Sequence, residues 1–276
     1  MRSCKAGMGR RIATVAAAAA TMMAASVAEA QIRSDAGFRT NTLARNDDGS
    51  TGPVSLGFTV NFFGSEFASA FVNNNGNITF DSPLSTYTPF NLTTTSRIII
   101  APYFADVDTR NLASAPTQYG TSTVDGRAAF GVSWDGVGYY NSAANRLNFF
   151  QLILIDRSDI LAGDFDFEFN YGSMQWEAGS ASGGSGGLGG SCARAGYSNG
   201  RDVSHELPGS AQCGAFIDGG PNSLQDAGRY VFQVRNGSVI NPNPSVVPEP
   251  ATFALLGSGL LGLGAFGLRR RKRDEA

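Results

Sequence analysis

The stretch Asp164-Phe165-Asp166-Phe167-Glu168-Phe169 alternates a carboxylate with a phenylalanine. Successive side chains of a β-strand point to opposite faces of the sheet. The alternation therefore predicts a strand with three phenylalanines on one face and three carboxylates on the other. We expect the phenylalanines to be buried and the acidic face to be in contact with water.

A second stretch, Phe149-Phe150-Gln151-Leu152-Ile153-Leu154-Ile155, lies a few residues earlier and is apolar on both faces. A strand of this kind is typical of the centre of a sheet that is covered on both sides. We therefore expect it to lie at the centre of the domain.

Other short apolar runs, bounded by Gly, Asn, Asp and Pro, predict further strands. Asn73-Asn74-Asn75-Gly76-Asn77 predicts a hairpin turn, because Asn and Gly tolerate positive φ. The predicted strands are 58–63, 71–72, 78–80, 97–104, 128–134, 148–155, 164–170 and 230–235. With no long helical period, the predicted fold is mainly β: one antiparallel β-sandwich-like domain with a flexible Gly-rich loop insert at 179–190.

The first thirty residues have the order of a secretory signal peptide. Four basic residues within 1–11 precede a small apolar run at 12–27, and Ala28-Glu29-Ala30 supplies the small residues that signal peptidase accepts. Cleavage is predicted before Gln31. A buried N-terminal helix is the alternative, but the nearly all-alanine run has no polar face.

The C-terminal end predicts a membrane helix. Residues 251–268 carry no charge, and as a helix these 18 residues would span about 27 Å. The basic cluster Arg269, Arg270, Arg271, Lys272 and Arg273 follows, and the positive-inside bias would keep it in the cytoplasm. Five glycines weaken the helix, which favours a transient anchor over a permanent one.

Pro248, Glu249 and Pro250 stand directly before this apolar segment. The tripeptide, the apolar segment and the basic cluster, in this order over residues 248–273, resemble the PEP-CTERM sorting signal. The resemblance implies that an exosortase, a bacterial membrane protease-transpeptidase, processes the tail. Residues 236–247, rich in Pro and Asn, are expected to form an extended stalk before it.

Composition limits the function of the region between the two ends. Removing nine of the 21 basic and four of the 23 acidic residues with the ends leaves 12 arginines and 19 carboxylates, a net charge of −7. The arginines are dispersed along the chain, whereas binding to nucleic acid needs a clustered basic face. We therefore expect no nucleic-acid partner.

Several short segments of this region follow one another in a recognisable order: 73–80, 100–108, 133–137, 150–154, 169–171, 175–176 and 195–197. Together they resemble the NIDO domain, an extracellular module named after nidogen. The resemblance covers about residues 58–216 within an expected domain at 31–235. It implies a module of the kind found in matrix and adhesion proteins, with no established enzymatic activity.

Cys192 and Cys213 would enter an oxidising compartment, where a disulfide between them is expected. It would close a loop of about 20 residues and contribute about 3 kcal/mol in the chain-entropy model. Free or metal-binding thiols are the alternative. His205 is the single histidine, however, and Cys2His supplies too few ligands for an ordinary structural zinc site.

Asp106 and Asp108 follow an apolar strand and, at spacing two, would share a strand face. With loop carbonyls they could bind calcium, which prefers oxygen ligands. The alternative is that they cap turns and pair with Arg110 at the surface. We expect no other cofactor.

The sequence motifs that could indicate a catalytic site give little support for one. The glycine-rich insert formally matches nucleophile-elbow and dinucleotide patterns, but neither match leads into a helix. Adjacent residues of Ser204-His205-Glu206 point to opposite sides of an extended chain, so they cannot form a triad locally, and we expect His205 to be a surface loop residue.

These features predict an exported, noncatalytic protein of the cell surface or extracellular matrix, held transiently in the inner membrane by its tail. Adhesion, or exopolysaccharide and biofilm assembly, is the expected role, with extracellular polysaccharide or surface proteins as partners and signal peptidase and exosortase as processing enzymes. The alternative is a carbohydrate-binding module for the cell's own exopolysaccharide. A secreted hydrolase has less support.

Overall fold

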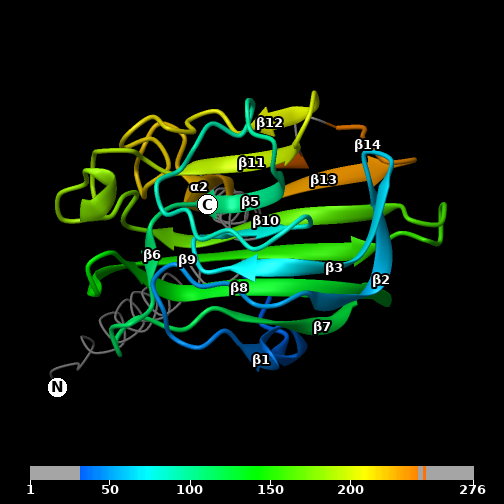
Figure 1. The fold of residues 1–276 in the computed structure, drawn as a ribbon, viewed down its shortest axis with the longest axis horizontal. Helices are drawn as coiled ribbons and strands as arrows, with labels where there is room; N and C mark the ends of the chain where they lie inside the picture. The colour runs from blue at the N-terminus through cyan, green and yellow to red at the C-terminus, as the bar shows by residue number, and fades with distance from the viewer. Residues whose placement is uncertain (1–31, 242–244, 247–276) are drawn as a thin grey trace, which may run out of the picture. The chain divides into compact units, whose positions relative to one another are not determined.

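The strands pair into two antiparallel sheets in a computed structural model that describes residues 32–241 and 245–246. The described residues belong to one compact unit. In the first sheet the order is β1-β7-β8-β9-β10-β13-β14, with β6 pairing with β8 and β15 with β13. Figure 1 shows the long strands β8, β9 and β10 side by side in the middle of this sheet. Its strands are β1 (Asn41–Thr42), β6 (Val107–Asp108), β7 (Gln118–Val124), β8 (Arg127–Tyr139), β9 (Ala143–Asp156), β10 (Phe165–Met174), β13 (Arg229–Arg235), β14 (Ser238–Val239) and β15 (Ser245–Val246).

The second sheet has the order β12-β11-β5-β4-β3-β2. Helical structure in the described residues is short: the 3-10 helices η1 (Ala36–Arg39) and η2 (Ser180–Ser182) and the helix α2 (Leu224–Ala227). The strands of this sheet are β2 (Val54–Phe62), β3 (Ser65–Asn73), β4 (Asn77–Thr79), β5 (Ile98–Phe104), β11 (Arg194–Asn199) and β12 (Ser204–Glu206).

One large aromatic core lies between the two sheets and makes the fold a sandwich. It contains Phe165, Phe167 and Phe169 of β10, which are fully buried as predicted. Opposite them, the second sheet contributes core residues such as Phe62 and Tyr197. The rings of Phe167 and Tyr197 lie 5.8 Å apart in a T-shaped arrangement, which is a favourable geometry for two aromatic groups.

The predicted central strand is confirmed. β9 pairs with β8 on one side and β10 on the other. Leu152 and Leu154 enter the main core, whereas Ile153 and Ile155 belong to a smaller cluster with Phe38 of η1. The N-terminal segment therefore covers the outer face of the first sheet, and β9 is buried on both sides.

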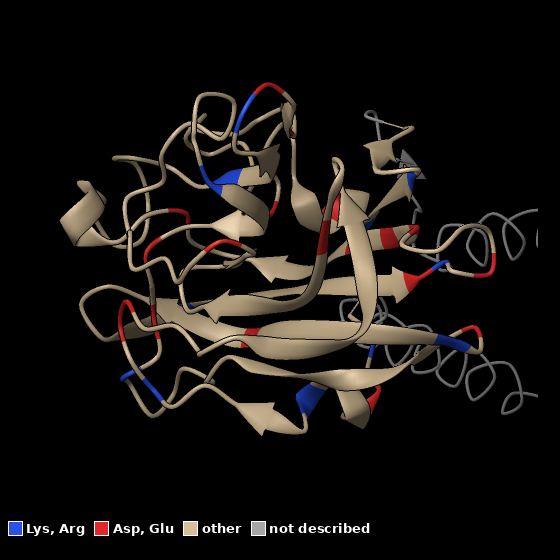
Figure 2. Ribbon diagram, turned by 45° about the vertical axis from the view of Figure 1, so that its right-hand side comes forward, with Lys and Arg blue, Asp and Glu red and all other residues tan. Residues whose placement is uncertain are grey.

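The predicted wet acidic face of β10 is wrong. Asp166 and Glu168 are only 8% and 5% exposed. The reason is that arginines from distant segments cover the carboxylates: Arg33 binds Glu168 at 2.8 Å, and Arg157 and Arg235 lie 2.6 and 2.7 Å from Asp166. In Figure 2 most other charged residues lie in loops and near strand ends.

The predicted hairpin is confirmed, with Asn73 opposite Asn77 between β3 and β4. Gly76 in the turn has φ of 75°. A Cβ atom there would lie 1.8 Å from the carbonyl oxygen of Tyr103, so the turn requires glycine in order to approach β5.

The eight predicted strands correspond to β2, β3, β4, β5, β8, β9, β10 and β13, although several are longer than predicted. The glycine-rich insert folds back on the end of β10, where the carbonyl oxygen of Gly187 accepts a hydrogen bond from the Glu177 amide at 2.7 Å.

The predicted signal peptide, the sorting motif and the membrane span at 251–268 lie outside the described residues. Within 32–241 and 245–246, no helix has the length and apolar character needed to cross a membrane.

Candidate functional site

The asparagine-rich turn attaches the second sheet to the segment that contains Asp106 and Asp108. The Asn74 side chain donates a hydrogen bond to the carbonyl oxygen of Val107 at 2.7 Å, and the Asn75 side chain accepts one from the Val107 amide at 2.9 Å. The buried indole of Trp134 donates to the carbonyl oxygen of Asn74 at 2.9 Å. The turn is thus a rigid, fully buried connection.

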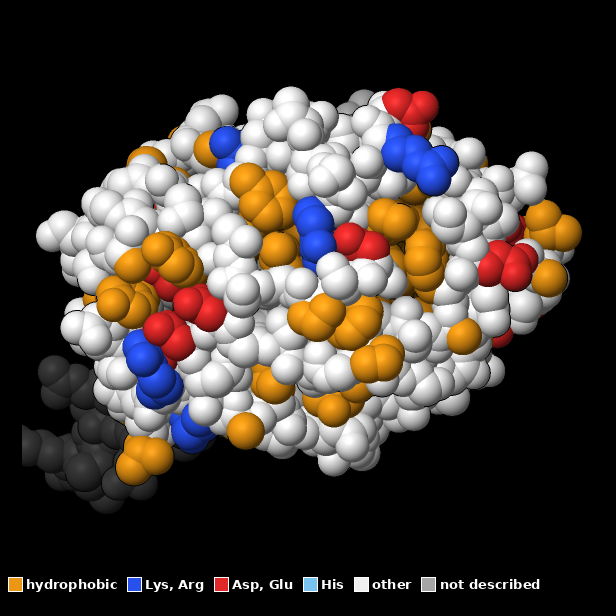
Figure 3. All heavy atoms as spheres, in the orientation of Figure 1, with side chains coloured by type: hydrophobic (Ala, Val, Ile, Leu, Met, Phe, Trp, Pro, Cys, Tyr) orange, Lys and Arg blue, Asp and Glu red, His pale blue; other side chains and the backbone are white. Residues whose placement is uncertain are grey.

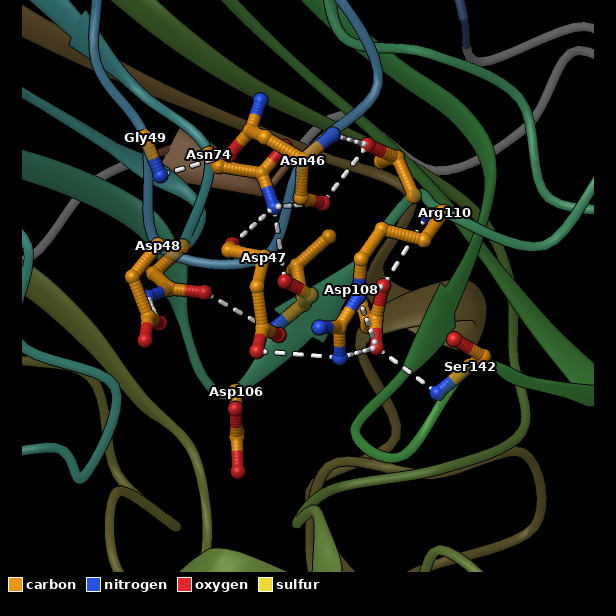
Figure 4. A network of polar contacts seen from close by, with 12 residues as sticks. Asn46, Asp47, Asp48, Gly49, Asn74, Asp106, Asp108, Arg110 and Ser142 are labelled. Carbon is orange, nitrogen blue, oxygen red and sulfur yellow. Dashed lines mark hydrogen bonds and ion pairs between the residues drawn. The ribbon is translucent and has the colours of Figure 1, made fainter.

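The same turn positions a loop from the N-terminal part of the domain. The Asn74 amide donates to the carbonyl oxygen of Gly49 at 2.9 Å, and the Asn75 side chain donates to Asp48 Oδ1 at 2.8 Å. Asp47 and Asp48 are thereby placed beside Asp106, so that ligand oxygens of the three carboxylates all lie within 4.8 Å of one another. Figure 4 shows these residues around the turn.

Asp108 has a different set of partners from Asp106. It is fully buried, and both of its oxygens accept hydrogen bonds from the Arg110 guanidinium, while the Ser142 amide donates to Oδ2 at 2.7 Å. Arg110 also pairs with Asp47 at 3.0 Å. The guanidinium therefore bridges two of the four aspartates in this network (Figure 4).

The hydrogen bonding of Asp106 is incomplete. Its side chain is 1% exposed, and Oδ2 lies 3.4 Å from the Ser182 hydroxyl. Asp106 Oδ1 and Asp47 Oδ1 are both buried and have no hydrogen-bond partner within the described chain. Two buried carboxylate oxygens without a donor are costly, because burial removes the water that would otherwise solvate them.

The electrostatics follow from this geometry. Burial, and then repulsion from Asp48 and Asp47, raises the pKa of Asp106 to about 7. Burial and repulsion from Asp108 and Asp48 raise the pKa of Asp47 to about 6, although Arg110 opposes this shift. Burial alone would raise the pKa of Asp108, but its hydrogen bonds with Arg110 and Ser142 outweigh burial and lower it.

The sequence-based pair of Asp106 and Asp108 is therefore divided between two environments. Asp108 pairs with Arg110, as in the alternative interpretation, but in a buried position. Asp106 joins Asp47 and Asp48, which sequence reasoning missed. The signal that could have drawn attention to them is Asn46-Asp47-Asp48-Gly49, a short acidic turn sequence.

The predicted disulfide between Cys192 and Cys213 is present, with Cα atoms 5.4 Å apart. Glu177 lies beside it, and its carboxylate accepts hydrogen bonds from the Gly189 and Gly214 amides. Because the two sulfurs are bonded to each other, this group of residues does not form a thiolate metal site.

His205 lies in β12 and not in a surface loop as predicted. It is half-buried, with its ring 5.8 Å from that of Tyr197 and 6.2 Å from that of Phe232. The neighbouring Glu206 pairs with Arg194 at 2.8 Å. The side chains of Ser204-His205-Glu206 thus do not assemble a catalytic triad.

On the face of the molecule in Figure 3, acidic and basic side chains lie next to one another in small groups, between separate apolar patches.

Comparisons with known proteins identify two parts of the chain. A family model for the nidogen-like domain matches residues 68–236, and one for the PEP-CTERM protein-sorting motif matches residues 246–272. The resemblances to NIDO domains and to the sorting signal are therefore confirmed. Together the two matches indicate an exported protein of the cell surface or extracellular matrix, with a tail of the kind that exosortase processes.

Three relatives illustrate the similarity. Alpha-tectorin of Mus musculus is 32% identical over 226 residues, which cover 71% of this chain and 10% of that protein. Alpha-tectorin of Homo sapiens is 32% identical over 221 residues, with the same coverage, and nidogen of Drosophila melanogaster is 27% identical over 160 residues, which cover 49% of this chain and 12% of that protein. This chain thus spans about a tenth of the length of these relatives. No solved structure matches it.

The family model covers residues 68–236, more than half of the chain, and the chain therefore belongs to the nidogen-like domain family.

Proposed function

We propose that this protein is a noncatalytic component of the cell surface or extracellular matrix that acts in adhesion or in exopolysaccharide and biofilm assembly. The observation that carries the proposal is the presence, in one chain, of a nidogen-like sandwich and a PEP-CTERM motif. The first is a module of extracellular proteins, and the second is a tail of the kind that exosortase processes. The packing of His205 against Tyr197 and Phe232 supports a noncatalytic role.

The tail is proposed to hold the chain in the inner membrane only until processing. In this scheme signal peptidase removes residues 1–30, residues 251–268 insert in the bilayer, and exosortase acts near Pro248, Glu249 and Pro250. Residues 236–247 would separate the domain from the membrane surface.

The experiment is intact-mass and fractionation analysis of the native protein, comparing the wild type with a variant in which Pro248, Glu249 and Pro250 are all replaced by alanine. We expect the wild type to lose the basic cluster at 269–273 and to leave the membrane fraction. The variant should retain the basic cluster and stay in the membrane fraction. Retention of the tail in both proteins would contradict processing at this motif.

A groove between β1 and β7 of the first sheet and β2 of the second favours carbohydrate binding as a second candidate function. It has a volume of about 430 Å³ and is lined by an aromatic ring, Tyr119, together with polar side chains such as Asn41 and Thr121. Ligand sites commonly combine aromatic side chains with a few hydrogen-bonding groups, as this groove does. If the cell's own exopolysaccharide binds there, Tyr119→Ala should weaken binding to the purified polymer, while Tyr87→Ala, at an exposed tyrosine elsewhere, should not. Equal binding by all three proteins would count against this groove.

A further inference from the structure

Asp47, Asp48 and Asp106 come from two segments about 60 residues apart in the sequence. Specific hydrogen bonds hold these two segments together. The Asn46 amide donates a hydrogen bond to the Thr109 side chain, and the Thr109 amide donates to the carbonyl oxygen of Asn46, both at 2.9 Å. With the bonds from Asn74 and Asn75, these contacts hold like charges together against their mutual repulsion.

The repulsion is only partly offset within the described chain. Arg110 pairs with Asp47 and Asp108, and no ion pair of Asp48 or Asp106 is found among the described residues. Asp106 is almost fully buried, and no group in the described part of the chain donates a hydrogen bond to its Oδ1 or to Oδ1 of Asp47. A carboxylate in such a position must either be protonated or face a cation.

We propose that Asp47, Asp48 and Asp106 form a calcium-binding site. The three carboxylates offer oxygens within 4.8 Å of one another, which is a separation that oxygens around a single ion can have. Asp106 Oδ1 and Asp47 Oδ1 would be satisfied by the ion in place of a missing donor. Ser182, whose hydroxyl is within reach of Asp106, and water would complete the coordination.

Calcium suits this site better than magnesium. Calcium accepts six to eight oxygen ligands in flexible geometry, whereas magnesium demands a near-ideal octahedron and keeps most of its water. The ligands here are carboxylates on a loop and on the segment between β5 and β6, and three carboxylates on one ion displace more of its water than magnesium usually gives up. The ion would tie the loop at 46–49 to the sheet.

The test uses the full chain in mild detergent, freed of metal with a chelator and then titrated with calcium chloride. Calorimetry should show one calcium ion per chain. A Kd of about 10⁻⁴ to 10⁻³ M, as in other extracellular calcium modules, predicts that calcium at about ten times its Kd raises the melting temperature by about 3–6 °C.

Asp106→Asn should abolish the calcium-dependent rise. In chelator this variant should melt at or above the wild type, because the neutral amide removes the repulsion without changing the shape of the side chain; this result separates loss of the site from loss of the fold. Asp48→Asn provides a second variant at a less buried position. Asp202→Asn, at an exposed aspartate elsewhere, should keep the full response.

The proposal is overturned if the wild type does not respond to calcium, or if Asp106→Asn and Asp48→Asn respond as the wild type does. An equal rise with magnesium at the same concentration would also overturn the assignment of calcium.

Discussion

The imidazole of His205 lies over the edge of the aromatic core, next to the rings of Tyr197 and Phe232. Its Nε2 atom is buried and has no hydrogen-bond partner within the described chain. Burial lowers the pKa of His205, and the neighbouring charge of Glu206 opposes this effect without cancelling it. The folded protein therefore favours the neutral imidazole.

This shift makes the stability depend on pH. Below the unfolded-state pKa of about 6.5, the unfolded chain binds a proton that the folded chain resists, so the free energy of unfolding falls as pH falls toward the folded pKa. His205→Phe should remove this contribution. We expect the melting temperature of the wild type, relative to the variant, to drop between about pH 7.5 and about pH 5. The difference between the two proteins cancels the other titrating groups, and a difference that is constant over this range would refute the prediction.

At the residue scale, the sequence indicates the chemical type of a side chain better than its place in the fold. The sequence indicated Asp106 as a candidate oxygen ligand. It did not indicate the neighbouring Asp47 and Asp48, because the contacts that join them to Asp106 connect segments about 60 residues apart in the sequence. The placement of His205 was mispredicted for a similar reason. β12 is only three residues long and has no apolar alternation of its own, so its position depends on its pairing with β11.

Among the elements, β10 depends on the N-terminal segment that crosses its outer face. Arg33 donates two hydrogen bonds to Glu168, each 2.8 Å long, and its backbone exchanges two bonds with the Gln151 side chain of β9. The carboxylate of Glu168 is buried beneath this segment. The segment at 32–39 thus covers the outer face of the sheet, and its Arg33 also neutralises the charge of the Glu168 carboxylate.

Arg33→Ala should lower the free energy of unfolding by about 3 kcal/mol, because it leaves the Glu168 carboxylate buried with a weaker partner, Arg229 at 3.7 Å. Denaturant unfolding measures the change. Adding Glu168→Gln to this variant should restore part of the loss, since the amide carries no charge to desolvate. Arg201→Ala, at an exposed arginine, is the matched control and should have little effect. A loss as large in Arg201→Ala as in Arg33→Ala would contradict the argument.

The alternation in β10 and the apolar run in β9 predicted both strands and the face that each buries in the core. The opposite face of β10 could not be predicted, because its arginines are dispersed at positions 33, 157, 229 and 235 and nothing local connects them to the carboxylates. β7 was missed because its sequence, Gln118-Tyr119-Gly120-Thr121-Ser122-Thr123-Val124, is mostly polar. It is a strand because it pairs with β8 along its whole length.

At the scale of the whole molecule, the class of fold, the nidogen-like domain and the sorting motif were accessible from the sequence, since they depend on patterns that repeat along the chain or stand in a fixed order. The order of the strands within the two sheets was not. It depends on pairings such as that of β10 with β13, which lie far apart in the sequence. The disulfide between Cys192 and Cys213 encloses β11 and β12, the last two strands at one edge of the second sheet.

Replacing both cysteines by serine should therefore lower the free energy of unfolding by about 3 kcal/mol, because the unfolded chain regains the freedom of the enclosed loop. Thermal unfolding with and without a reductant measures the effect. The wild type should melt at a lower temperature in reductant, and the double-serine variant should not respond to it. A wild type that is indifferent to reductant would show that the bond contributes little to the stability of the domain.

The arginines over β10 have one more consequence. Mobile ions screen exposed charges that are far apart, but they screen partly buried pairs at hydrogen-bond distance much less. The ion pairs of Asp166 and Glu168 are of the second kind, and they are held by guanidinium groups that stay charged at any pH a cell meets. A protein outside the cell has no control over the ionic strength around it, and we expect the charge pairing on this sheet to weaken less with added salt than pairs of exposed charges would.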